Sequence, residues 1–146
     1  MKTIFLTFFC IAMAVTNTQY ASNAEMDSWK VEHNGKLKLK ATTENEGKNV
    51  ITIKKEDLKK TGVLLVAYKE MDGQRGWERS ITLFDEKDNE LLKSEGALAK
   101  VPNAKLAELA NKYKIIKIYT WSLPTDPAVA ATVRVRRVHL CTILIK

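Results

Sequence analysis

The side chains best suited to chemistry in this sequence are His139 and Cys141, which are separated by one residue within an apolar stretch. On a regular strand, residues two positions apart project from the same face, so this pair could offer two ligands to a metal ion. No Cys-x-x-Cys or His-x-His motif stands nearby, and a blue-copper centre needs a second histidine and usually a methionine. We therefore predict that the pair packs in the core, and we expect neither a metal nor another cofactor.

Motifs of known catalytic machinery are missing from the sequence. It contains no nucleophile elbow, P-loop, dinucleotide fingerprint or H-E-x-x-H motif. The acidic run Asp85–Glu90 lacks the central glycine of a calcium loop and carries Lys87 at a ligand position, which favours a solvated turn. His33 lies in a predicted hairpin turn, where we expect it to be exposed and without a role. We predict a protein that is not an enzyme; the alternative is a small hydrolase whose carboxylate pair meets only in the fold.

Basic residues point to a different kind of site. The formal net charge is +7, which favours anionic partners such as polysaccharides or lipid headgroups. Arg134, Arg136 and Arg137 could bind sulfate, phosphate or carboxylate groups in a bidentate manner. Four lysines could extend this surface, namely Lys36, Lys38, Lys112 and Lys114. The competing interpretation is that these charges keep the sequence soluble and protect a long strand from edge-to-edge association.

Two further features are candidates for binding. Trp77, Tyr119 and Trp121 could form an exposed aromatic platform for sugars, although their places in apolar segments also suit a core. The segment Pro124-Thr125-Asp126-Pro127 is stiffened by two prolines, which fix φ. A stiff loop of this kind would suit docking to a partner or inhibition of one, but it is also an ordinary connection between strands.

The elements that must position these residues are mostly strands. Two C-terminal apolar runs, Ile115–Leu123 and Thr132–Ile145, are rich in β-branched and aromatic residues. The first is apolar on both faces, which is typical of a central strand. In the second, the apolar phase changes, and a bulge at Arg136-Arg137 would restore one apolar face.

Upstream, Trp29–Ala41 predicts a hairpin. A three-residue loop His33-Asn34-Gly35 would pair Val31 with Leu37 and Trp29 with Leu39, giving one buried face and one lysine-rich face. The predicted meander strands and single helical turn follow in order: strand Asn49–Lys54, a turn over Lys55–Gly62 that buries Leu58, and strands Val63–Glu70, Trp77–Asp85 and Glu90–Ser94. One amphipathic helix is predicted over Ala104–Lys112, with Asn103 as its N-cap.

Strands that recur between turn signals predict a mainly β fold, an antiparallel β-sandwich of about seven to eight strands with one short α-helix. The alternative is an α+β arrangement, in which a curved antiparallel sheet packs on the helix. No repeat or linker divides residues 25–146, so we expect a single domain.

Residues 1–24 have the pattern of a secretory signal peptide: a basic start, an apolar run and small residues before Glu25. We do not expect a lipoprotein through Cys10, because Phe8 and Phe9 occupy positions where small residues are required. The apolar run Ile4–Val15 is too short to cross a bilayer comfortably, and the sequence has no second long apolar segment. We therefore expect an exported, periplasmic or extracellular, non-catalytic binding protein. Its partner would be a glycan, an anionic polymer or another envelope protein, and we do not expect nucleic acid.

Overall fold

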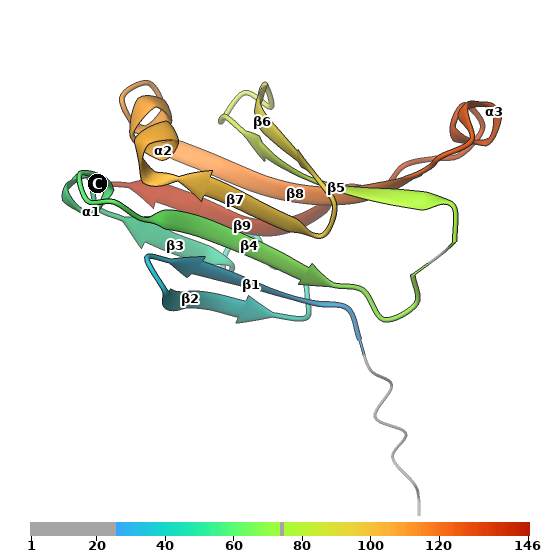
Figure 1. The fold of residues 1–146 in the computed structure, drawn as a ribbon, viewed down its shortest axis with the longest axis horizontal. Coiled ribbons are helices and arrows are strands. Elements are labelled where there is room, and N and C mark those ends of the chain that lie inside the picture. The colour runs from blue at the N-terminus through green and yellow to red at the C-terminus, as the bar shows by residue number, and fades with distance from the viewer. Residues whose placement is uncertain (1–25, 74) are drawn as a thin grey trace, which may run out of the picture.

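The fold is a sandwich of two β-sheets. The computed structural model describes residues 26–73 and 75–146 (Figure 1). The strands are β1 (Ser28–His33), β2 (Lys36–Ala41), β3 (Val50–Ile53), β4 (Val63–Lys69), β5 (Trp77–Phe84), β6 (Glu90–Glu95), β7 (Leu98–Pro102), β8 (Ile115–Pro124) and β9 (Val138–Ile145). The helices are α1 (Lys55–Leu58), α2 (Asn103–Ala110) and α3 (Pro127–Ala130). The prediction of a mainly β sandwich is confirmed. The described residues form nine strands where about seven to eight were predicted, and three short helices where one helix and a helical turn were predicted.

The first sheet has the order β2-β1-β4-β7, and the second has the order β3-β9-β8-β5-β6. All pairings are antiparallel except β3 with β9, which is parallel. Alternate residues of both sheets point into the space between them, and α2 adds the fully buried Leu106. Trp29 joins the two sheets, because its indole Nε1 donates a hydrogen bond of 2.8 Å to the carbonyl oxygen of Leu140. No helix among the described residues has the length and apolar character needed to span a bilayer.

The predicted meander is wrong, because consecutive strands lie in different sheets. β4 is in the first sheet, whereas β5 and β6 are in the second. The chain then returns to the first sheet through β7, which pairs with β4 and which the sequence pattern did not predict. In β7 only Ala99 and Val101 are buried, so its apolar signal is short and weak.

The β1–β2 hairpin also differs from the predicted register. Its turn contains two residues, Asn34 and Gly35, with φ of 51° and 74°, as a type I′ turn requires. Glu32 pairs with Leu37, and Val31 pairs with Leu39, which leaves Lys38 as the extra residue of a bulge. The bulge restores the apolar phase on the inward side without a longer loop. Its consequence is that Leu37 points outward and is 57% exposed.

β8 is central in its sheet, as predicted, and lies between β9 and β5. The last strand, however, begins only at Val138, so Thr132–Arg137 is not part of it. The irregularity is not at Arg136-Arg137. Ile118 pairs with Cys141 and Tyr119 pairs with His139, so Leu140 is the extra residue. Because Leu140 is fully buried, the bulge keeps an additional apolar side chain in the core.

The helical turn α1 buries Leu58, as predicted. In contrast, Asn103 is not the N-cap of α2, because Pro102 has that position and no side chain caps the helix. Asn103 is buried, and its Nδ2 donates to the side-chain oxygen of Asn34 and to the backbone oxygens of Asp57 and Lys60.

His33 belongs to the same network and is buried rather than exposed. Its Nε2 lies 3.0 Å from Oδ1 of Asn103, and only 3% of the residue is accessible. Gly62 makes this approach possible, since a Cβ there would lie 1.9 Å from Oδ1 of Asn34. The network therefore ties the β1–β2 turn to both helices at this end of the sandwich.

Candidate functional site

The candidate site is the outward side of the first sheet, which we call the lysine face. Its side chains alternate with the buried ones along β1, β2, β4 and β7. One row across the sheet contains Leu37, Glu32, Leu65 and Lys100, and the next contains Lys40, Lys30, Ala67 and Leu98. Ser28 and Lys69 face each other beyond the second row. No helix or loop covers this side of the sheet in Figure 1.

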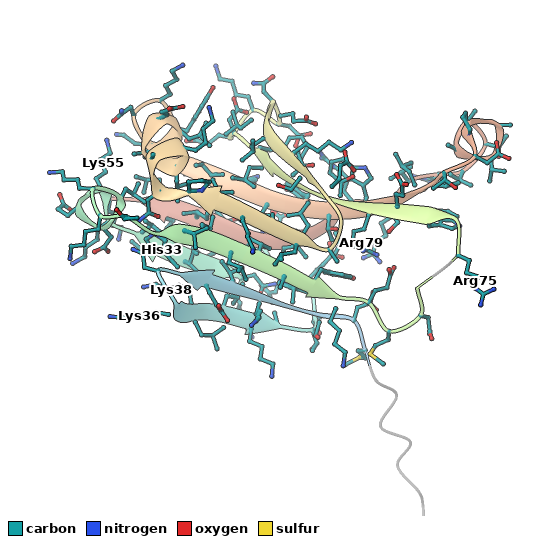
Figure 2. The ribbon with its side chains drawn as sticks, in the orientation of Figure 1. His33, Lys36, Lys38, Lys55, Arg75 and Arg79 are labelled. Carbon is teal, nitrogen blue, oxygen red and sulfur yellow. The ribbon has the colours of Figure 1, made fainter. Side chains whose placement is uncertain are left out.

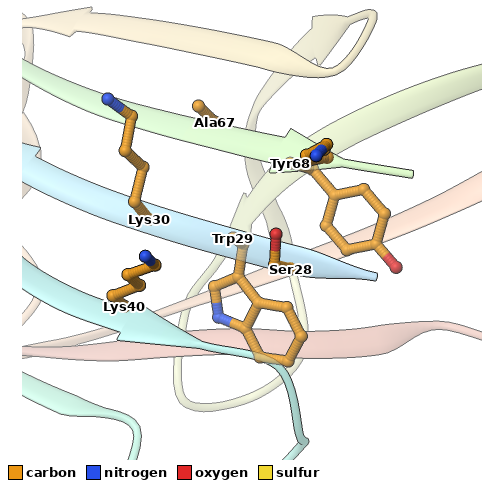
Figure 3. Close-up of a pocket in the computed structure, with 7 residues that line it drawn as sticks. Ser28, Trp29, Lys30, Lys40, Ala67 and Tyr68 are labelled. Carbon is orange, nitrogen blue, oxygen red and sulfur yellow. The ribbon is translucent and has the colours of Figure 1, made fainter. Parts of the chain in front are cut away.

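The lysines of this face are crowded. Lys30 and Lys40 are directly opposite each other, an arrangement that is destabilising for like charges. Together with Lys69 they line an open hollow over Ala67 and Ser28, which Trp29 and Tyr68 also line. Figure 3 shows Lys30 on β1 reaching toward Ala67 and Lys40 on the neighbouring strand β2. Lys30 is paired with Glu32 at 2.8 Å, whereas Lys40, Lys69 and Lys100 form no ion pair within residues 26–73 and 75–146. The face therefore carries an excess of positive charge that no described carboxylate neutralises.

The chemistry available on the lysine face is that of anion binding. A lysine ammonium is a compact charge on a flexible stem and can follow ligands of different shapes. Trp29 and Tyr68 lie on the same strands but point into the core, so the outward rows contain no aromatic ring. These rows contain one carboxylate, Glu32, and no histidine or cysteine, so they offer no acid–base pair.

The three predicted arginines line one open hollow with Val135, but they differ in their partners. Arg136 is paired with Glu44. Arg137 binds Asp88 through two hydrogen bonds, of 3.1 and 2.9 Å. Its guanidinium also lies 5.1 Å from the ring centre of Phe84 and 4.8 Å from that of Tyr119. Arg134 is exposed and makes no ion pair within the described part of the chain. Two of the three arginines are thus occupied by carboxylates of the protein itself.

The predicted lysines do not extend this arginine group into one surface. Lys36 and Lys38 lie on β2, at the edge of the other sheet, and point away from the sandwich in Figure 2. Lys112 and Lys114 lie just before the start of β8. Arg137 lies beside a later part of that strand, because its neighbour Val138 pairs with Thr120.

Of the predicted aromatic residues, Tyr119 and Trp121 lie on the outward side of the second sheet, together with Phe84. Phe84 is 5.7 Å from Tyr119 and 6.1 Å from Trp121, measured between ring centres. We call this group, with His139 and Arg137, the aromatic face. Phe84, Tyr119 and His139 are buried, so the face is closed by contacts among its own members.

Trp77 is not part of that group. It pairs with Pro124 at the start of β5 and shares the inward phase of Arg79 and Ile81. It is half-buried and lines a separate hollow with Arg79, Glu95 and Gly96. The structure therefore does not gather the three predicted aromatics into one platform.

His139 and Cys141 point to opposite sides of the sheet, contrary to the prediction that they share a face. The bulge at Leu140 adds one residue between them, so His139 contacts Tyr119 outside, and Cys141 lies in the core opposite Ile118. Burial raises the pKa of the Cys141 thiol to about 12 and lowers the pKa of His139. Within the described residues, no group of three potential metal ligands comes together.

Arg79 interrupts the apolar phase of β5, and the structure explains why. Its guanidinium lies 4.2 Å from the ring centre of Tyr68 and donates to Glu70 and to Thr120. Tyr68 in turn donates a hydrogen bond of 2.6 Å to Asp27, and this bond lowers the pKa of the Asp27 carboxyl. Arg79 therefore satisfies polar groups at the open end of the sandwich (Figure 2).

The predicted docking loop stands at the end of an arm. Beyond Arg79 and Thr120, β5 and β8 pair only with each other, and α3 follows at the tip (Figure 1). Pro124 is buried, and Thr125 is held by hydrogen bonds from its backbone nitrogen and its hydroxyl to the oxygen of Gly76. Asp126 caps α3 by accepting from the nitrogen of Ala128, and Pro127 occupies the first helical position.

No family model, curated protein or solved structure matches this chain. Sequence reasoning did not find Lys30, Lys40, Lys69 and Lys100 as a group. The alternation of Lys and Leu in β2 was a local signal, but the neighbours of Lys40 on β4 and β7 depend on the strand order.

Proposed function

We propose that this chain is an exported, non-catalytic binding protein that holds an anionic ligand on the lysine face. The observation that carries the proposal is the direct pairing of Lys30 with Lys40, beside Lys69 and around Ala67. Glu32 pairs with Lys30, whereas Lys40 and Lys69 have no carboxylate partner within the described residues, so an anion bound among these lysines meets uncompensated positive charge. The basic composition and the apolar leader at residues 1–24 are consistent with a role outside the cytoplasm.

The shape of the face indicates the kind of anion. The lysines span the four strands of the sheet, a width of roughly 14 Å at the usual strand spacing. The hollow over Ala67 is open to solvent and is not an enclosed cavity of the kind that holds small ligands. An extended ligand with repeated negative charges fits this surface better than a single small anion. A neutral glycan fits poorly, because the outward rows contain no aromatic ring on which a sugar could stack.

The test uses dextran sulfate as a soluble polyanion and measures its binding by calorimetry. We expect binding that weakens as salt rises, because the interaction is between exposed charges. The triple variant Lys30→Gln, Lys40→Gln, Lys69→Gln should lose most of the affinity. The matched control removes three lysines elsewhere, Lys54→Gln, Lys112→Gln and Lys114→Gln, and should bind almost as the parent does. Equal losses in the two variants would mean that net charge alone is responsible, and the proposal would be wrong.

A second candidate function is supported by the arm. Thr125, Asp126 and Pro127 are exposed at a projecting tip that follows the buried Pro124, and the exposed Val129 and Val135 lie before and after the turn that ends α3. Such a tip could insert into the cleft of a protease and block it. Inhibition of a panel of serine and cysteine proteases by the parent, but not by Pro124→Gly with Pro127→Gly, would support this function. No inhibition of any protease in the panel would count against it.

A further inference from the structure

We infer that the ligand of the lysine face is the surface of an anionic lipid bilayer, on which the first sheet lies flat. This inference rests on the proposed function and names the source of the negative charge. It commits to one partner out of the possible polyanions. Three properties of the face carry it: its leucines, its charge and its shape.

The first property is the exposed leucines. Leu37 is 57% exposed at the β2 edge, and Leu98 is 44% exposed at the β7 edge. The two leucines lie at opposite edges of the sheet and in neighbouring rows. At the other end of each row is a lysine: Lys100 ends the row of Leu37, and Lys40 ends the row of Leu98. A bilayer interface accepts both kinds of side chain, since lysines reach the headgroups while leucines enter the acyl boundary. A soluble polysaccharide offers no comparable environment for the leucines.

The second property is the choice of cation. All the basic side chains of the outward rows are lysines, and the face has no aromatic ring. Lysines are depleted from the centres of protein–protein interfaces, where aromatic residues and arginine are enriched. A protein partner would therefore have to desolvate several lysines at the centre of its contact. A bilayer leaves the ammonium groups hydrated among the lipid phosphates.

The third property is the shape of the lysine face, whose apolar residues lie between the lysines. Val63, Leu65 and Ala67 are half-buried between the lysines, and no deep groove separates them. A peptide or helix ligand needs a groove to bury its side chains. A sheet face whose exposed leucines lie at its two edges, with half-buried apolar residues between them, suits contact with an extended surface.

The experiment measures co-sedimentation of the full chain with vesicles of phosphatidylcholine alone and with vesicles containing phosphatidylglycerol. The readout is the excess binding to the anionic vesicles, since residues 1–24 contribute equally in all variants. We expect the triple variant Lys30→Gln, Lys40→Gln, Lys69→Gln to reduce this excess about 100-fold, at roughly fivefold per lysine. The control variant Lys54→Gln, Lys112→Gln, Lys114→Gln should change it little.

The leucines separate a bilayer from other polyanions. Leu37→Ser with Leu98→Ser should weaken vesicle binding about tenfold, because less apolar surface enters the lipid. The same variant should bind dextran sulfate as the parent does. Both leucines are exposed, so we expect the variant to fold, and its melting temperature checks this; Leu98→Ser alone serves if the double variant does not fold.

Three outcomes overturn this inference. If the parent shows no excess binding to anionic vesicles but binds dextran sulfate through the lysine face, the bilayer is wrong and the proposed function stands. If the parent binds neither probe through these lysines, both proposals fail. Vesicle binding that is unaffected by both the lysine and the leucine variants would also overturn the inference, because it would arise elsewhere in the chain.

Discussion

The outward sides of the two sheets carry similar charges but use them differently. On the aromatic face, Arg137 is bound to Asp88 and lies over the rings of Phe84 and Tyr119. On the lysine face, Lys30 and Lys40 face each other, and Lys40 has no carboxylate partner within the described residues. Within the described residues, the aromatic face holds the guanidinium of Arg137 with its own groups, whereas most lysines of the lysine face have no carboxylate partner.

This difference separates stability from binding. A cation that contacts rings and a carboxylate of its own protein contributes to folding, whereas crowded exposed cations oppose it slightly. The functional candidate is therefore the side that does least for stability. Sequence patterns alone favour the opposite choice, because arginines beside aromatic residues resemble a binding site.

Among substitutions that test this difference between the two faces, the largest loss of stability is expected on the aromatic face. Phe84→Ala should lower the free energy of unfolding by about 3 kcal/mol, because it removes a buried ring that contacts Tyr119 and Trp121. Urea denaturation measures the change, and Phe84→Leu, which keeps most of the volume, should lose less. A loss from Phe84→Ala as small as that of an ordinary surface substitution would show that the aromatic face is not a structural unit.

A smaller loss is expected from Arg137→Ala, about 1 kcal/mol. The ion pair with Asp88 is partly exposed and contributes little, so most of the effect should come from the contact with the two rings. Arg137→Lys keeps the charge without the planar fork and should recover only part of the loss. The same urea experiment decides between these expectations, and full recovery with lysine would contradict the role given to the rings.

The aromatic face should also make stability depend on pH through His139. Burial lowers the pKa of His139 below its usual 6.5. The unfolded chain then takes up a proton at a higher pH than the folded protein does, so stability is complete above pH 6.5 and declines as the pH falls through the folded pKa. Urea midpoints measured from pH 7.5 to 5 should fall for the parent and fall less for His139→Asn. Parallel slopes would show that other groups cause the decline.

The smallest change in stability is expected on the lysine face. Lys40→Gln removes a like-charge pair with Lys30, so the free energy of unfolding should stay within about 0.5 kcal/mol of the parent or rise slightly. Thermal and urea denaturation at low salt measure this change. Lys117→Gln, on the second sheet, is the control for removing one lysine. A clear loss of stability from Lys40→Gln would mean that the lysine has a structural partner, and the contrast between the two faces would fail.

Several elements were predictable because their signals are local. β-branched residues and turn signals predicted β3, β4, β5 and β8. The burial of Leu58 was predicted because it is the one apolar side chain of a polar segment. Two of the errors, the register of the β1–β2 hairpin and the shared face of His139 and Cys141, have one cause. Single-residue bulges at Lys38 and Leu140 shift which side chains face the core, and each is chosen by the partner strand across the ladder. The burial of His33 has the same origin, since Asn103 lies 70 positions away in the chain.

By itself, the sequence determined that the protein is mainly β, that its surface is basic, and where most strands lie. These properties follow from composition and from the alternation of neighbouring residues, which short-range sterics and burial translate directly into strands. Only the tertiary structure decided which strands share a sheet, and hence that Lys40, Lys30, Lys69 and Lys100 occupy one face. It also decided that Arg137 is occupied by Asp88. Such pairings depend on contacts between residues far apart in the chain, which local patterns do not encode.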